Sequence, residues 1–237
     1  MLEDTVLEEA KANVEEAIIY LAERMEIMPD VLCSFERPEV LVADEVGLFQ
    51  DKSGNYQVKA LGIYSVDKNR ITFRTDSLDG HFRTGEEVSH YLHRWLNPSV
   101  GGMSFTPSNR DFWQRKELCE LVGNYGALVY SHSKGEDYEM NPEFSMADLI
   151  STRNVKKYEG LYDIMYTLIT FRATRSATEA FTKFGDKLLP ALSRLSLESS
   201  KTELLRLLPV NLFLSQQDYK SLRNMVKEMD CIPKSKD

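Results

Sequence analysis

The chain has 237 residues, of which 42% are hydrophobic and 28% charged, and its formal net charge is −8. These values are ordinary for a globular protein with a packed core, and the length suits one large domain or two small ones. The acidic balance speaks against wrapping of nucleic acid through phosphate neutralisation. We therefore expect no nucleic-acid partner. No apolar run approaches the roughly 20 residues of a membrane-spanning helix, so we expect no membrane partner either.

The cysteines are few and give no sign of a disulfide framework. Cys33, Cys119 and Cys231 are far apart and include no Cys-x-x-Cys pair, so a structural zinc knot is not indicated either. The first residues are acidic, unlike the basic start of a targeting segment. We predict a cytoplasmic protein.

Charge is distributed unevenly along the chain. Residues 1–150 carry 14 basic and 27 acidic side chains, whereas residues 151–237 carry 15 basic and 10 acidic ones. This split predicts two regions, or a basic helical tail that docks on an acidic part, and the sequence does not choose between them.

A long amphipathic helix is predicted at the start of the chain, from about residue 3 to residue 28. Apolar residues recur there at helical spacing with Glu and Lys between them, and Pro29 marks the expected end. The apolar positions are Leu7, Ala10, Val14, Ala17, Ile18, Leu21 and Met25.

Three short runs rich in β-branched and aromatic residues follow, at residues 39–43, 56–66 and 70–74. The polar segments 51–55 and 67–69 between them are turn signals. We predict a small antiparallel sheet.

The next predicted helix begins near Thr84, because Thr84 followed three residues later by Glu87 has the pattern of a capping box. It should run to about Leu96, since Asn97-Pro98 stops a helix. A further helix is predicted over residues 111–130.

The rest of the chain, over residues 146–229, is predicted to be helical. Its apolar stripes, such as Leu188, Leu189, Leu192 and Leu195, are typical of a core or of a surface that docks a partner. The predicted class is α+β and mostly helical, with an α+β region at 1–145 and a helical region at 146–237 packed on it.

The segment Glu86-Glu87-Val88-Ser89-His90 carries the chemistry of the chain. On a helix, Glu86 and His90 lie one turn apart, so both side chains can reach one metal ion. Glu87 follows Glu86 directly and is a second carboxylate close to this pair. Glu86, His90 and His93 share one side of the helix, which is either a site or simply a solvent-exposed face.

The helix predicted over 111–130 supplies a candidate third ligand. Glu117, Glu120 and Asn124 form a narrow polar stripe on an otherwise apolar surface. We favour Glu120 over Glu117, because the residues next to Glu120 are more apolar. Glu120 could instead pair with a nearby Arg or Lys. Gly123 and Gly126 predict close packing of this helix against another.

Three features together resemble the zincin metallopeptidases that use a glutamate as third ligand. They are the segment 86–90, the strand-turn-strand pattern at 60–73, and the helix predicted over 111–130 that carries Glu120. The resemblance covers about residues 39–130. It implies zinc, with His90 and Glu120 as ligands, Glu87 as general base, and Glu86 at a position where a histidine is expected. It also implies an extended peptide substrate aligned along the strand before the metal helix, and a cleft tyrosine such as Tyr125 that stabilises the oxyanion.

Glu86 is the departure from the zincin pattern. Two carboxylates and one imidazole make a more anionic site, so a bound metal would be a weaker Lewis acid, and manganese or iron become alternatives to zinc. We therefore predict a metallopeptidase-like protein whose metal site has diverged and has either kept or lost its activity. The alternative is a non-catalytic interaction or scaffold protein that retains the fold and binds a peptide or protein partner.

The other three histidines are alternatives to, or neighbours of, the predicted metal ligands. His93 could replace the missing imidazole, His81 could enter from the loop before the helix, and His132 suits the C-terminal end of its helix. A di-iron centre would need a second Glu-x-x-His segment, which the chain lacks. It also lacks the glycine-rich phosphate loop, the nucleophile elbow and the dinucleotide-binding fingerprint.

Overall fold

The computed structural model describes residues 2–44, 46, 49–50, 56–57, 61–78, 80–102, 112–136 and 186–195. This part is mostly helical with a small sheet, in agreement with the α+β prediction. Its elements are α1 (Leu2–Arg24), α2 (Pro29–Cys33), β1 (Glu39–Ala43), β2 (Phe49–Gln50), β3 (Tyr56–Gln57), β4 (Gly62–Ser65), β5 (Arg70–Arg74), the short 3-10 helix η1 (Thr75–Ser77), α3 (His81–Leu96), α4 (Pro98–Gly101), α5 (Phe112–Ser133) and α9 (Asp186–Ser193). Among these helices, none combines the length and the apolar composition that crossing a bilayer requires.

α1 is the amphipathic helix that the sequence predicts, and five of the seven predicted apolar positions are buried within it: Ala10, Val14, Ala17, Ile18 and Leu21. A sixth, Met25, is buried just after its end. The helix ends at Arg24 rather than near residue 28. Glu26 has a positive φ of 56°, and the amides of Glu26 and Ile27 donate to the carbonyls of Glu23 and Ala22. This is a Schellman turn, which closes a helix without a proline. Pro29 instead begins α2.

The main sheet has three strands in the order β1-β5-β4, and it is mixed rather than antiparallel. β4 and β5 are antiparallel, as predicted, but β1 runs parallel to β5. Among the described strands β5 comes last in the sequence, and it lies between β1 and β4 in the sheet. The segment between β1 and β4 therefore reverses the chain, and the turn from β4 to β5 restores the direction of β1. The predicted strand over 56–66 is divided, because β3 pairs with β2 in a separate hairpin and β4 joins the main sheet.

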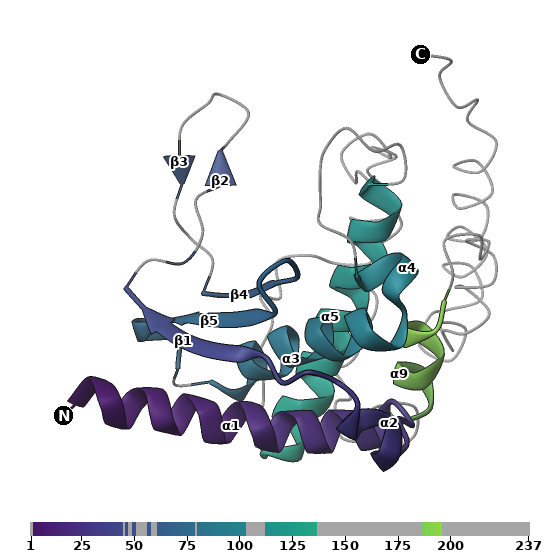
Figure 1. Ribbon diagram of the computed structural model, residues 1–237, viewed down its shortest axis with the longest axis horizontal. Helices are drawn as coiled ribbons and strands as arrows, with labels where there is room; N and C mark the ends of the chain where they lie inside the picture. The colour runs from purple at the N-terminus through teal and green to yellow at the C-terminus, as the bar shows by residue number, and fades with distance from the viewer. Residues whose placement is uncertain are drawn as a thin grey trace, which may run out of the picture.

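One face of the sheet is buried by helices. Val40, Tyr64, Ile71 and Phe73 share this face, and α3 lies against it, with the rings of Tyr64 and Tyr91 packed edge to face at 5.9 Å. α1 packs on both α3 and β1, and α5 packs along α3. Figure 1 shows α1 running beside β1, with α3 and α5 next to one another.

α3 begins at His81, three residues before the predicted cap Thr84, which is buried inside the helix. Gly80 precedes the helix in an extended conformation and supplies no side-chain cap. The carboxylate of Glu136, just after α5, accepts hydrogen bonds from the His81 backbone N–H at 3.2 and 3.3 Å. The cap therefore comes from a residue 55 positions away, which a local pattern cannot predict.

α9 is the part of the predicted C-terminal region that the structure describes. It packs on α5 and α1 through buried Leu189 and Leu192, and the amide of Asn97 donates to the carbonyl of Leu195 at 2.8 Å. The predicted boundary between residues 145 and 146 lies outside the described residues.

Candidate metal centre

Small residues let α3 and α5 approach closely. A Cβ at Gly85 would lie 2.9 Å from the Cα of Ala127, and a Cβ at Gly126 would lie 1.9 Å from Ser89 Oγ. The predicted close packing at Gly126 is confirmed. The side chains that face the gap between the two helices are therefore enclosed by backbone.

Gly123 has a different part in this contact, because it makes room for His90. A Cβ at residue 123 would lie 2.5 Å from both Cε1 and Nε2 of the His90 ring, closer than real Cβ contacts allow. The imidazole thus rests directly on the backbone of α5. The sequence predicts tight packing at Gly123 but not that a candidate ligand occupies the space.

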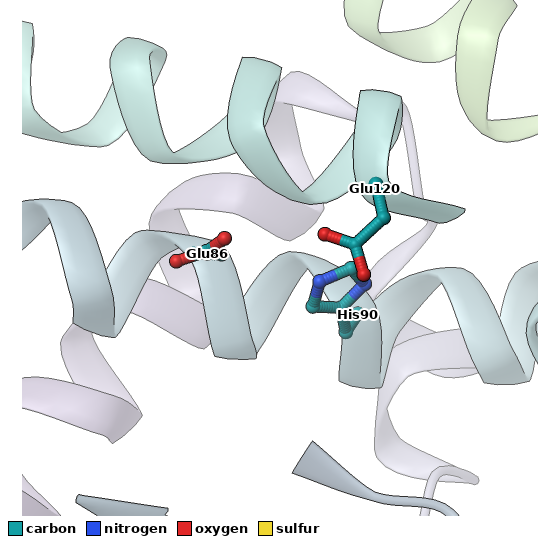
Figure 2. A group of neighbouring side chains, drawn as sticks. All are labelled: Glu86, His90 and Glu120. Carbon is teal, nitrogen blue, oxygen red and sulfur yellow. The ribbon is translucent and has the colours of Figure 1, made fainter. Parts of the chain in front are cut away.

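Glu86, His90 and Glu120 come together at this contact. Each offers a ligand atom, and the three atoms lie within 4.8 Å of one another. Figure 2 shows the carboxylate of Glu120, from α5, directed at the His90 ring, with Glu86 one turn earlier on α3. Glu86 is buried, whereas His90 and Glu120 are partly exposed. The group is therefore reachable from solvent on one side.

The donor set fits a divalent ion. Imidazole and carboxylate groups bind zinc, manganese and iron. Tetrahedral ligands at about 2.0–2.2 Å from a metal lie roughly 3.4 Å apart, and the three ligand atoms lie within 4.8 Å of one another, so they would have to move closer together to hold one ion. Ligand type, number and proximity all suit one ion.

Arg83 reaches this group from the first turn of α3. Its guanidinium donates from Nη1 to Oε2 of Glu86, and it also acts electrostatically on Glu87. The Arg83 side chain is 32% exposed and the Glu86 side chain 9%, so the pair links a surface cation to a buried carboxylate. Arg83 is not among the residues predicted from the sequence, although its spacing of three residues from Glu86 is typical of an ion pair on a helix.

Glu87 points at the edge of the sheet. Its carboxyl group accepts a hydrogen bond from the backbone N–H of Tyr64, and a Cβ at Gly62 would lie 3.1 Å from its Cγ and Oε1. Burial, followed by the charges of Glu86 and Glu120, raises the pKa of Glu87 well above its usual range. Burial and the two neighbouring carboxylates thus favour the protonated form of Glu87, whereas the charge of Arg83 opposes them.

Tyr64 is held in place by polar contacts between the sheet and α3. Arg94 donates to the Tyr64 hydroxyl at 2.7 Å and to Asn69 Oδ1 at 3.1 Å. Asn69, in a turn with a positive φ of 45°, also donates to the Glu36 carbonyl at 3.1 Å. These bonds fix the strand edge that carries the partner of Glu87.

His93 lies in the core and outside the group of three ligand atoms. It is fully buried, and neither ring nitrogen has a hydrogen-bond partner among the described residues. Burial, followed by the nearby His90, lowers the pKa of His93 to about 3. His93 is therefore a neutral imidazole. Glu86 and His93 are buried and His90 is partly exposed, so this side of α3 is not the solvent-exposed face that the sequence left open.

The remaining predicted contributors lie elsewhere. His81 is the first residue of α3, and its Nδ1 pairs with Glu136 at 2.5 Å, while His132 lies in the last turn of α5. Asn124 donates to the backbone carbonyl of Glu120 at 2.8 Å. The Glu117 side chain lies outside the described part.

Tyr125 is buried in the hydrophobic core. It follows Gly123 by two residues, or about 200° around α5, so its Cα lies on the side turned away from His90. Its role with an oxyanion stays a prediction.

The chain matches no protein-family model, no curated protein and no solved structure.

Proposed function

We propose that the protein binds one divalent metal ion through Glu86, His90 and Glu120 and hydrolyses peptide bonds as a metallopeptidase with a diverged, carboxylate-rich site. The observation that carries this proposal is the convergence of the three ligand atoms within 4.8 Å, from two helices in glycine-mediated contact. Zinc is the first candidate, and manganese and iron are alternatives because two of the three ligands are carboxylates.

Glu87 is the proposed general base. A bound dication would polarise the scissile carbonyl and make its own water more acidic. The same charge would lower the pKa of Glu87, which burial and two neighbouring carboxylates otherwise raise. An ionised Glu87 could then accept the proton of the attacking water.

The proposed substrate is an extended peptide at the free edge of β4. β4 is an edge strand, and the register places the N–H and C=O of Tyr64 on the side away from β5. An added strand would pair with such groups. Glu87 already accepts the Tyr64 N–H, so the general base lies where the peptide backbone would arrive.

Metal content tests the first half of the proposal. Protein stripped by a chelator and reloaded with zinc, manganese or iron should retain about one metal ion per chain by elemental analysis. His90→Ala should lose it, whereas His132→Ala, a histidine outside the group, should keep it. Equal retention by both variants would contradict the ligand assignment.

Peptide cleavage tests the second half. Glu87→Gln keeps the size of the side chain and removes the proton acceptor, so turnover of a peptide mixture followed by mass spectrometry should fall at least about a hundredfold. Metal content should be unchanged, and the exposed Glu23→Gln serves as the control. Turnover that survives in Glu87→Gln would remove Glu87 as the base.

A non-catalytic interaction protein is the second candidate. It is favoured by two features of the chain as it stands: burial and neighbouring carboxylates raise the pKa of Glu87, and Arg83 pairs with Glu86. Both features make these two carboxyl groups weaker bases. No retained metal under any loading, together with no cleavage, would favour this candidate.

A further inference from the structure

Arg83 is the charged residue of the candidate metal centre that the proposed chemistry does not use. Its guanidinium already holds one of the two oxygens of Glu86, a proposed ligand. Glu86 is nearly enclosed, whereas about a third of the Arg83 side chain is exposed. The cation therefore lies between solvent and a buried carboxylate.

The site needs a counter-ion whenever it holds no metal. Glu86, Glu87 and Glu120 are close enough for the first and last to act on Glu87, and Arg83 acts on Glu87 in the opposite sense. Buried carboxylates that lack a cation are strongly destabilising. Arg83 supplies that positive charge from within the chain.

We propose that Arg83 and a divalent metal ion are alternative counter-ions of Glu86, so that Arg83 lowers the metal affinity of the site. This inference rests on the proposed metal site. A metal about 2 Å from a Glu86 oxygen would lie close to the guanidinium, and two like charges in a poorly solvated place repel strongly. Loading therefore requires Arg83 to move away from Glu86.

The exposed position of Arg83 makes this movement feasible. Its guanidinium carbon lies 5.6 Å from the centre of the Phe82 ring, a second favourable contact of the cation in its present position. A long, partly exposed arginine has many side-chain conformations in which its charge is hydrated. Glu86 lacks that freedom, because it is held between α3 and α5.

Calorimetric titration of chelator-treated protein with zinc, and separately with manganese, tests the inference. Arg83→Gln should bind metal about ten- to a hundredfold more tightly than the wild type. This is the factor by which residues that hydrogen-bond a metal-binding side chain typically change metal affinity. Lys11→Gln is the matched control, since Lys11 forms an i, i+3 ion pair with Glu8 on α1 and loses the same charge. Its metal affinity should equal that of the wild type.

Two further measurements separate competition from a merely structural role. Without metal, Arg83→Gln should unfold at a lower temperature than the wild type, and saturating metal should remove or reverse that difference. In a Glu86→Gln background, Arg83→Gln should no longer change metal affinity. Arg83→Met also removes the charge and keeps a long side chain, so it should bind metal more tightly than the wild type even if Arg83→Gln does not fold.

Each outcome decides between the two proposals. Binding by the wild type that is unchanged or weakened in both Arg83 variants overturns the competition and leaves the proposed metal site intact. Binding by Arg83→Gln but not by the wild type supports the competition and shows that the native chain holds arginine in place of metal. Binding by neither overturns both.

Discussion

α1 and α3 pack on each other and on the same sheet, yet they differ in whether they bury ionisable side chains. α1 buries Ala17, Ile18 and Leu21 completely, and its described acidic residues, such as Glu8, Glu15 and Glu23, are exposed. α3 buries Val88 and Leu92 just as fully, but it also buries Glu86, Glu87 and His93.

The two helices therefore contribute differently to the free energy of folding. Burial of apolar surface stabilises a fold, whereas burial of an ionisable group costs free energy unless a partner compensates. Glu86 has Arg83 as a partner, and His93 has no hydrogen-bond partner among the described residues. We infer that α1 supplies stability and that α3 accepts a cost in order to gather ligand groups.

The largest effect is expected at Leu21, in the apolar half of this comparison. Leu21→Ala should lower the free energy of unfolding by about 2–5 kcal/mol, because a fully buried leucine leaves a cavity. Urea unfolding with and without metal is the measurement, and the loss should be the same in both. The exposed neighbour Ile19→Ala should have little effect, and an equal loss there would contradict the assigned role of α1.

His93 should give α3 a dependence on pH that α1 lacks. The pKa of His93 is about 3 in the folded chain and near 6.5 when unfolded. Between these values the unfolded chain takes up a proton that the folded chain refuses, so stability falls as the pH drops from about 6.5 towards 3. The loss is of the order of a few kcal/mol.

The comparison of wild type with His93→Leu isolates this contribution from other titrating groups. Urea unfolding of both proteins at several pH values should give a difference in unfolding free energy that changes below about pH 6.5. A difference that stays constant from neutral to acidic pH would show that His93 is solvated.

A substitution at Gly126 tests whether the burial of Glu86, Glu87 and His93 depends on contact between α3 and α5. Gly126→Ala should cost about 1–3 kcal/mol, since the new Cβ would lie 2.8 Å from Ser89 Cβ as well as against its Oγ. Thermal unfolding is the measurement. Gly80→Ala is the control, because nothing lies within 4 Å of a Cβ there, and an equal loss in both variants would rule out the contact.

The smallest effect is expected for the surface ion pair of α1. Lys11 and Glu8 lie 2.8 Å apart with side chains 47% and 71% exposed. Such pairs contribute about 0.3–0.5 kcal/mol on a helix, so Lys11→Ala should change the unfolding midpoint in urea only marginally. A loss above about 1 kcal/mol would mean that the charges of α1 are more than a solvated surface.

The sequence predicted what depends on local periodicity and spacing. Some predictions use only the spacing of residues within a single helix. They are the apolar stripe of α1, the helical positions of Glu86 and His90, and the preference for Glu120 as a candidate ligand. The parallel pairing of β1 with β5 and the cap from Glu136 depend on distant segments. The burial of Glu86 and Glu87 likewise requires α5 and the sheet to be in place, so a helix projection could not decide it.

The cap on α3 also bears on the order in which the protein folds. The His81 backbone N–H donates to the Glu136 carboxylate, so this cap on the first turn of α3 cannot form until the chain has been synthesised past α5. During translation the sheet strands and α1 emerge earlier and can collapse first. The side chains that converge on His90 would then assemble together, in a late and cooperative step.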